Sequence, residues 1–358
     1  MLRLCLLFFL GIVGSLASSR CTDGDVCKLS TNSLRWFIIG DWGGIPVWPY
    51  YTYAQSTVAG TLGSLGSEQD TQFLLAIGDN FYYTGVHSVY DERFKETFED
   101  VYTSASLRMP WYVLGGNHDH YGNISAQIAY TQRSSRWVYP SLYYSISYEL
   151  ADGLRADFVM IDTVELCGNT KDLTFSSVLN YLVTRSFPPQ GPANITKANR
   201  QWLWIEQQLA ALSGKSDYLF VVGHYPVWSI AEHGPTDCLL QRLRPLLHRY
   251  KVSAYISGHD HCLQHLRHAA NDSTVSYIVS GAGGYLDASK RHKSAVPQGS
   301  LQFHYPDGSS VLGKLGLTRG GFVSASLNST AAEFRFLRGD GNLLYSYAFP
   351  PRRPSFSS

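Results

Sequence analysis

Hydrophobic residues in this chain gather in short runs, and five of these runs lead through glycine into a polar residue. The runs cover residues 36–39, 73–77, 111–114, 219–222 and 254–256. The junctions that follow them are Gly40-Asp41, Gly78-Asp79, Gly116-Asn117, Gly223-His224 and Gly258-His259. Short runs rich in Ile, Val, Phe and Tyr predict buried β-strands, so each junction marks a predicted strand end.

The polar residues at these five strand ends are all of types that bind metal ions. Glycine lets the backbone turn sharply and approach a ligand closely. In open α/β sheets, ligands bind beyond the carboxyl ends of the strands. We therefore expect five strands to deliver Asp, Asp, Asn, His and His to one edge of one sheet. A single Gly-Asp pair would indicate only a turn, but five such junctions indicate a binding site.

The rest of the pattern alternates predicted strands with predicted helices, as in one α/β domain over residues 35–349 that follows an N-terminal segment, 18–34. Helical spacing of apolar residues covers 91–101 and 199–212. The last part of the domain, 320–349, predicts β-strands joined by a glycine-containing turn.

One connection is unusually long, and the chain ends in a short polar tail. Residues 168–198 include a proline-rich stretch and a glycosylation sequon. A connection of this length inside a domain is typical of a lid or a binding loop. The tail, 350–358, is expected to fray.

Composition and charge narrow the class of protein. The chain has 358 residues, of which 44% are hydrophobic and 16% charged, as in a well-packed globular protein. Its 29 basic and 28 acidic residues nearly balance. Nucleic acid is therefore not an expected partner, because binding it normally requires a basic surface.

The first 17 residues predict a secretory signal peptide. Arg3 precedes an apolar stretch, Leu4 to Val13, and Ser15-Leu16-Ala17 provides small residues at a cleavage position. No later stretch predicts a membrane span, so we expect a secreted or lysosomal protein. Four sequons suit that compartment, at Asn123, Asn194, Asn271 and Asn328.

Cysteine counting leaves an odd number after cleavage. Of six cysteines, Cys5 lies in the signal peptide, so at most two disulfides form within the mature chain. Cys21 and Cys27 are close enough to pair locally, or pair with nothing. Cys262 fits a small buried hydrophobic residue, and the alternative is a metal role beside His261.

The ligand types divide into two groups by hardness. Carboxylate and phenolate oxygens favour a trivalent ion, which suits Asp41 and Tyr82 with a further Asp and one His. Neutral imidazole and amide oxygen suit a divalent first-row ion, which points to the set Asn117, His224 and His259. Asp79 is the natural bridge, since each of its oxygens can bind one ion.

The spacing of the last two histidines supports a pair of ions. His259 and His261 are two residues apart, so on an extended segment they point to the same side. Each can then serve one ion of a close pair. A two-metal centre of this kind polarises a phosphoryl group and supplies hydroxide as the nucleophile.

These motifs, in this order and at these separations, resemble those of the purple acid phosphatases, in particular the small animal type. The motifs are Gly40-Asp41-Trp42-Gly43, Gly78-Asp79-Asn80-Phe81-Tyr82, Gly116-Asn117-His118-Asp119, Gly223-His224-Tyr225-Pro226, Gly258-His259-Asp260-His261 and the stretch Gly283 to Arg291. Generic metallophosphoesterases carry Asp-x-His at the first junction. Here Asp41-Trp42-Gly43 lacks that histidine and Tyr82 follows the second junction, which separates this family from its relatives.

The resemblance implies a calcineurin-like metallophosphoesterase fold, a four-layer αββα sandwich. It implies hydrolysis of phosphate monoesters at acidic pH, with metal-bound hydroxide attacking phosphorus. The implied ferric site is Asp41, Asp79, Tyr82 and His261. The implied second site, for ferrous iron with zinc or manganese as alternatives, is Asp79, Asn117, His224 and His259.

The resemblance also implies roles beyond the metal ligands. It places His118 and His233 near the substrate phosphate, where an imidazolium binds phosphate and protonates the leaving group. It suggests a disulfide between Cys167 and Cys238, and a lid at 168–198 that proteolysis opens. Four other histidines are expected at the surface or behind the site: His120, His265, His268 and His292. Asp119 is expected to orient a ligand or His118.

Two rival functions follow from the same residues. One is a metallophosphodiesterase or nucleotidase, and the other is a secreted protein that binds iron or cycles its redox state. The expected substrates are phosphoproteins, aryl phosphates and nucleotides, and the expected oligomeric state is a monomer.

Overall fold

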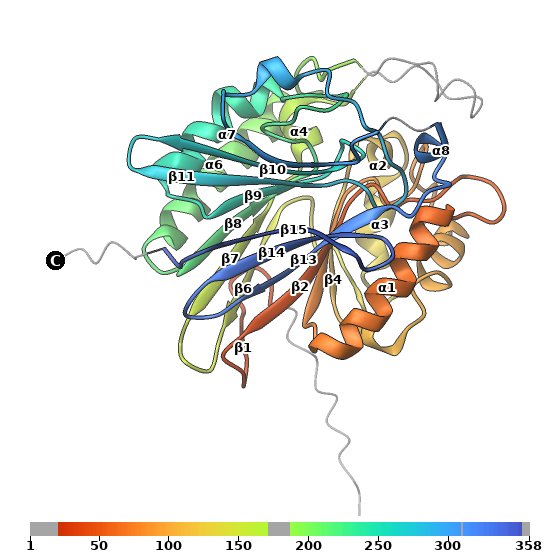
Figure 1. The fold of residues 1–358 in the computed structure, drawn as a ribbon, viewed down its shortest axis with the longest axis horizontal. Coiled ribbons are helices and arrows are strands. Elements are labelled where there is room, and N and C mark those ends of the chain that lie inside the picture. The colour runs from red at the N-terminus through yellow and green to blue at the C-terminus, as the bar shows by residue number, and fades with distance from the viewer. Residues whose placement is uncertain (1–20, 171–186, 309–310, 353–358) are drawn as a thin grey trace, which may run out of the picture.

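The computed structural model describes residues 21–170, 187–308 and 311–352. Two β-sheets pack face to face and helices cover their outer faces, which makes a four-layer αββα sandwich (Figure 1). Helices α6 (Ile195–Ser213) and α7 (Asp237–Arg249) cover one sheet, and α1 (Tyr53–Gln69) and α3 (Ile124–Tyr130) cover the other. The fold class predicted from the sequence is confirmed.

One sheet has seven strands, and its parallel half carries the first three junctions. Its order is β15 (Leu343–Phe349), β14 (Ala332–Arg338), β13 (Gly321–Leu327), β2 (Leu34–Ile39), β3 (Phe73–Ile77), β4 (Trp111–Leu114) and β5 (Trp137–Val138). Strands β2 to β5 run parallel, and β13 to β15 form an antiparallel meander that joins β2.

The other sheet has eight strands and carries the last two junctions. Its order is β1 (Val26–Lys28), β6 (Tyr144–Glu149), β7 (Arg155–Met160), β8 (Tyr218–Val222), β9 (Ala254–Ser257), β11 (Ser273–Ser280), β10 (Leu263–Ala270) and β12 (Leu301–Tyr305). Strands β7, β8, β9 and β11 run parallel.

The expectation that five strands share one sheet is therefore wrong. Strands β2, β3 and β4 lie in the seven-stranded sheet, whereas β8 and β9 lie in the eight-stranded sheet. Periodicity identifies buried strands but does not show which strands pair. The five carboxyl ends still meet, because the sheets stack with those ends at the same end of the sandwich (Figure 1).

The predicted helices differ from the observed ones mainly at their ends. The segment 199–212 lies inside α6, which begins earlier because Asn194 accepts a hydrogen bond from the backbone of Lys197 at 3.0 Å and caps the helix. The segment 91–101 is helical only at Phe94–Glu99, as a π-helix. Asp91 shortens the helix at its start. Its carboxylate accepts a hydrogen bond of 3.0 Å from the backbone N–H of Arg93 and so holds a turn there.

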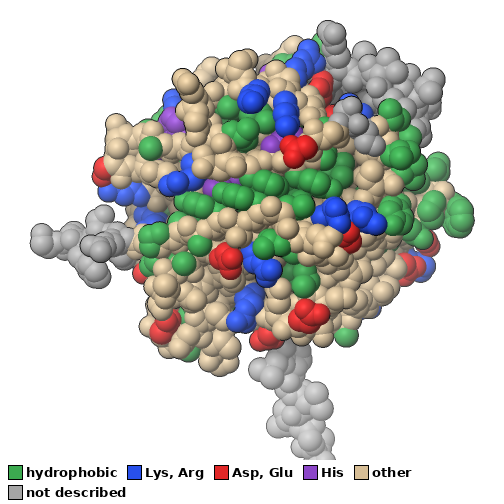
Figure 2. Space-filling model, in the orientation of Figure 1, with side chains coloured by type: hydrophobic (Ala, Val, Ile, Leu, Met, Phe, Trp, Pro, Cys, Tyr) green, Lys and Arg blue, Asp and Glu red, His purple; other side chains and the backbone are tan. Residues whose placement is uncertain are grey.

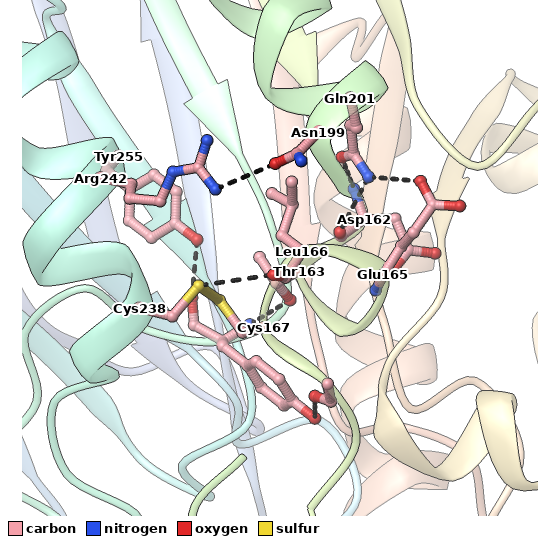
Figure 3. The surroundings of a disulfide bond; sticks show 12 residues. Asp162, Thr163, Glu165, Leu166, Cys167, Asn199, Gln201, Cys238, Arg242 and Tyr255 are labelled. Atoms are coloured by element: carbon pink, nitrogen blue, oxygen red, sulfur yellow. Dashed lines mark hydrogen bonds between the residues drawn. A yellow bond between two sulfur atoms is a disulfide. The ribbon is translucent and has the colours of Figure 1, made fainter. Parts of the chain in front are cut away.

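Two disulfides occur in the described residues. One joins Cys21 to Cys27, and the other joins Cys167 in α4 (Thr163–Cys167) to Cys238 in α7 (Figure 3). Beside the second, Gln201 of α6 donates a hydrogen bond to Glu165 of α4 at 2.8 Å. Cys262 is a buried free thiol, as expected for a small hydrophobic residue.

Three predicted segments lie partly or wholly outside the described residues. The signal peptide, 1–17, is outside, as are residues 171–186 of the predicted lid. The tail is described only up to Arg352, whose guanidinium donates hydrogen bonds to the carbonyls of Ser213, Ser216 and Tyr250. The start of the predicted frayed tail is therefore anchored. In the described ranges, we find no helix with the length and hydrophobicity that a bilayer crossing requires.

Candidate metal centre

The five junctions place their polar residues together at the carboxyl ends of the strands. Asp41 follows β2, Asp79 follows β3 and Asn117 follows β4, while His224 follows β8 and His259 follows β9. All five residues are buried. Buried charged and polar groups are costly unless they find partners, so this concentration requires either mutual pairing or a bound cation.

The backbone at these junctions is held in an uncommon conformation. Asp41, Asp79 and His259 have φ angles of 58°, 52° and 69°, in the left-handed region that non-glycine residues seldom adopt. The neighbouring glycines allow close approach, since a Cβ on Gly116 would lie 2.2 Å from a carboxylate oxygen of Asp79. Strained backbone of this kind clusters at functional sites.

A first cluster of donors contains Asp41, Tyr82 and His261. The phenol of Tyr82 donates to Oδ1 of Asp41 at 3.1 Å and lies 2.9 Å from Nε2 of His261. The same imidazole nitrogen is 3.6 Å from Oδ1 of Asp41. Three donor atoms from three separate loops thus converge on one point.

A second cluster contains Asp79, Asn117, His224 and His259. Nε2 of His224 lies 3.0 Å from Oδ1 of Asn117 and 3.4 Å from Oδ1 of Asp79. One ligand atom from each of Asp79, His224 and His259 lies within 4.8 Å of the others, so this group can hold a metal ion. The two clusters contain the residues of the two sets expected from ligand hardness, with Asp79 in the second, and their assignment as metal ligands stays a prediction.

The electrostatics of the second cluster favour a cation between Asp79 and His224. Burial disfavours a charge on either residue. At His224, however, the attraction of the Asp79 carboxylate is stronger than the effect of burial, and the pKa of the imidazole rises to about 9. Burial raises the pKa of the Asp79 carboxyl, but the neighbouring His224 and His118 lower it by more, so the net change is downward. A metal ion held by Asp79 and His224 would take the place of the proton on this imidazole.

The other two candidate ligand histidines are held neutral. Burial, and then the neighbouring His233 and His224, lower the pKa of His259 well below its usual range. Burial and His233 lower the pKa of His261 to about 3. Neutral imidazole is the form that binds metal.

His118 lies beside the first cluster, in the short helix α2 (Asn117–Tyr121). Its ring centroid is 4.6 Å from that of Tyr82. Its Nδ1 is 2.6 Å from the carbonyl oxygen of Tyr83, so Nδ1 carries a proton and donates it to that oxygen. The other ring nitrogen, Nε2, is then the atom that can act on a ligand.

His233 lies on the opposite side, against the second cluster. Its ring centroid is 4.1 Å from that of His259, and its backbone N–H donates to Asp260 at 2.8 Å. A cavity of about 510 Å³ opens beside these two rings. Its other walls include Phe187, Leu240 and Arg291.

Asp119 acts on the loops that carry the candidate ligands. Its carboxylate accepts hydrogen bonds from the backbone N–H groups of Gly116 at 2.8 Å, Asn80 at 3.1 Å and Phe81 at 3.2 Å. It therefore ties the loop after β3 to the loop after β4. Burial and the charge of Asp79 raise its pKa to about 6.

The four remaining histidines of the prediction lie in different surroundings. His120 pairs with Asp162 at 2.7 Å, and His292 lines the cavity and lies 2.7 Å from the carbonyl oxygen of Ala231. His268 lies 3.1 Å from His248, away from the clusters. His265 is fully buried between strands of the two sheets, and its ring centroid lies 4.4 Å from that of Tyr347. A surface position for His265 is therefore wrong.

Two residues that support the site escaped the sequence analysis. Arg93 is buried and donates to the carbonyls of Tyr82 at 2.7 Å and Gly43 at 2.5 Å, which joins the two loops of the first cluster. Tyr285 stacks on His261 with ring centroids 5.5 Å apart. Arg93 carries no local signal, because an arginine in a helical pattern predicts a solvent-exposed position. Tyr285 lies in the motif Gly283 to Arg291, but nothing in that motif assigns it a role.

Comparison with known proteins now identifies the family. Residues 34–263 match the family model described as calcineurin-like phosphoesterase. The chain is 43% identical over 329 residues to the human tartrate-resistant acid phosphatase type 5, covering 90% of this chain and 93% of that protein. This chain belongs to the purple acid phosphatases.

Further relatives extend the similarity. Purple acid phosphatase 7 of Arabidopsis thaliana is 30% identical over 354 residues, covering 97% of this chain and 96% of that protein. A solved structure of GAP50, described as the anchor in the inner membrane complex of Plasmodium, superposes with a TM-score of 0.70. It covers 91% of each chain at 23% identity, so it supports the fold alone.

The family implies a dimetal centre, and the donor set of this chain fits one. Two carboxylates, a phenol, an amide and three imidazoles converge in two adjoining clusters. Oxygen and imidazole nitrogen donors of this kind bind first-row transition metals.

Proposed function

We propose that this protein is a secreted or lysosomal acid phosphatase that hydrolyses phosphate monoesters at a centre of two iron ions. The observation that carries the proposal is the convergence of Tyr82, Asp41 and His261 beside a second, imidazole-rich cluster. Family membership supports a hydrolase that acts on phosphoesters.

In this proposal each cluster holds one metal ion and Asp79 serves both. Asp41, Asp79, Tyr82 and His261 hold a ferric ion, because carboxylate and phenolate are hard anionic donors. Asp79, Asn117, His224 and His259 hold the second ion, which is ferrous, with zinc and manganese as alternatives. When bound, the ions polarise the phosphoryl group and activate water.

The protein's own contribution is to hold the phosphate and move a proton. His118 donates from Nδ1 to the carbonyl of Tyr83, and in the imidazolium form its Nε2 also carries a proton, which it can donate to a phosphate oxygen or a departing alkoxide. His233 lies on the other side of the centre, where it can contact the same phosphate. Both are most effective as imidazolium, which fits turnover at acidic pH.

The cavity beside His233 accommodates the leaving group. Its volume of about 510 Å³ suits an aryl or peptide group, and Phe187 and Leu240 provide apolar wall. We therefore propose phosphoproteins and aryl phosphates as substrates, with nucleotides as a further class. Comparing monoester with diester turnover distinguishes this activity from a phosphodiesterase.

A visible absorption spectrum with iron analysis, on wild type and Tyr82→Phe, tests the metal assignment. Coordination of Tyr82 to ferric iron predicts a broad visible band and about two irons per chain. Tyr82→Phe removes the phenolate, so the band disappears while the ligands of the second cluster remain. A colourless and active wild type loaded with zinc or manganese would contradict the iron assignment but leave the phosphatase assignment standing.

A further inference from the structure

Large hydrophobic side chains gather on the surface beside the metal centre. Among the described residues, thirteen large hydrophobic side chains are exposed, and seven of them lie on two short segments. These seven define the Trp48 surface: Val47, Trp48, Tyr51, Tyr53, Val311, Leu312 and Leu317. Trp48 itself is 84% exposed. Scattered hydrophobic residues are normal on a surface, but a concentration of this size marks an interaction site.

The two segments of the Trp48 surface are adjacent although they are far apart in sequence. The backbone N–H of Ala54 donates to the carbonyl of Gly316 at 2.9 Å. One segment is the loop between β2 and α1 with the first residue of α1, Tyr53, and the other is the short helix α8 (Val311–Lys314) with the residues that follow it. Figure 2 shows hydrophobic side chains along the edge where Figure 1 places this loop and α8.

The Trp48 surface also borders the metal centre. The loop leaves β2 directly after Asp41, and Ile45 packs against Tyr82 and Tyr285. The side chain of Thr52 donates to the carbonyl of Gly284 at 2.9 Å, in the loop that carries Tyr285. A partner bound to this surface is therefore brought to the end of the sandwich that holds the site.

The surroundings of the Trp48 surface do not favour a charged partner. The cations nearest to it in sequence are paired: Lys314 with Asp287 at 2.9 Å, and Arg319 with Asp340 at 3.4 Å. Paired surface charges exert little attraction on an acidic peptide or an anionic membrane. Attraction must therefore come from the apolar side chains themselves.

The shape and composition of the surface indicate the partner. The loop between β2 and α1 stands out from the edge of the molecule in Figure 1 and offers a convex projection. Tryptophan and tyrosine beside aliphatic residues are typical of segments that lie in the headgroup region of a bilayer. A convex projection can enter a fluid lipid surface without needing a preformed complementary groove.

Two of the four predicted glycosylation sites, Asn271 and Asn328, lie at the end of the sheets remote from the metal centre, whereas Asn123 lies just after α2, beside it. Asn328 follows Leu327 of β13, which pairs with Leu34 at the amino end of β2. Asn271 follows β10 at its end remote from His261. Glycans at both positions would extend from the opposite end of the sheets.

We propose that the Trp48 surface docks this protein on a zwitterionic phospholipid bilayer, with Trp48 and Leu312 inserted among the headgroups. Docking would bring the metal centre to the lipid surface. The inference rests on the exposed side chains and their surroundings, so it does not depend on the proposed phosphatase activity.

Sedimentation with phosphatidylcholine vesicles tests this proposal on the full metal-loaded protein. Wild type is expected to bind equally at low and high salt, because the contact is apolar. Trp48→Ser with Leu312→Ser should weaken partitioning by about tenfold or more, the effect of losing one or two large apolar contacts. Leu203→Ser, which removes an exposed leucine on α6, serves as the matched control and should bind like wild type.

Several results would overturn the proposal. They are absence of wild-type binding to phosphatidylcholine, equal binding by the double variant, and binding only to anionic vesicles that high salt abolishes. A wild-type dimer in light scattering that the double variant lacks would assign the surface to a second copy of the chain instead. Iron content and turnover of a soluble aryl phosphate should be unchanged in the double variant, which shows that it folds.

Discussion

At the scale of single residues, the proposed proton transfer depends on imidazoles outside both donor clusters. His118 is buried, its Nδ1 is fixed by Tyr83, and its backbone N–H donates to Asp79 at 3.0 Å. These contacts hold the ring in one orientation beside Tyr82. The residue therefore holds the position that a general acid requires, and in the imidazolium form Nε2 carries the proton that it would transfer.

Replacing His118 tests this role. His118→Ala is expected to lower kcat for an aryl phosphate by about 10²- to 10⁴-fold, the range for losing a general acid, while metal content stays unchanged. Steady-state kinetics with metal analysis measures both. His268→Ala, which changes a histidine away from the clusters, should keep wild-type turnover. Full activity in His118→Ala would remove this histidine from the mechanism.

At the same scale, the types of candidate ligand could be predicted from the sequence but their supports could not. Asp41, Asp79 and His259 follow glycine at strand ends, which is a local pattern. Arg93 and Tyr285 reach the site through contacts with carbonyls and rings distant in sequence. Such contacts depend on the folded path of the chain, which no local pattern encodes.

At the scale of the elements, His265 of β10 links the two sheets. Its Nδ1 lies 3.0 Å from the hydroxyl of Tyr345 in β15, and its ring packs on Tyr347. Burial and the nearby Arg267 lower its pKa to about 3. The folded protein therefore keeps this imidazole neutral, whereas the unfolded chain protonates it near pH 6.5.

This difference predicts a loss of stability in acid. The contribution of His265 to the free energy of unfolding is complete above about pH 6.5. It falls as the pH drops toward 3, because in this range the unfolded chain binds a proton at this imidazole and the folded protein does not. At pH 5 the loss is about 2 kcal/mol. His265→Phe keeps the ring and removes the titration, so its free energy of unfolding should fall less between pH 7 and pH 5.

Denaturant unfolding at several pH values measures this effect. Parallel pH dependence in wild type and His265→Phe would contradict it. An enzyme proposed to work in acid would lose this stability within its working range of pH.

At the scale of the whole molecule, the sandwich depends on aromatic packing between its sheets. Trp36 of β2 is fully buried. Its ring centroid lies 5.4 Å from that of Phe158 in β7 and 5.8 Å from that of Phe220 in β8. On its own sheet it stacks on Phe73 at 5.8 Å. These contacts fix how the strand that carries Asp41 lies against the strand that carries His224.

Truncating this side chain should destabilise the protein strongly. Trp36→Ala is expected to lower the free energy of unfolding by about 3–5 kcal/mol, because it leaves a large cavity between the sheets. Trp48→Ala removes the same side chain from a position that is 84% exposed, and should change stability by about 0.5 kcal/mol or less. Equal effects of the two substitutions in urea unfolding would contradict this account of the core.

The sequence by itself determined the strands, the polar residues at their ends and the chemistry those residues favour. Each depends on neighbours along the chain: apolar runs, the glycine before each ligand and the hardness of the donor atoms. Only the tertiary structure decided that β2, β3 and β4 lie in one sheet and β8 and β9 in another. Stacking of the two sheets depends on contacts between residues more than a hundred positions apart, such as the hydrogen bond of 2.8 Å from the backbone N–H of His259 to the carboxylate of Asp41. No local pattern specifies them.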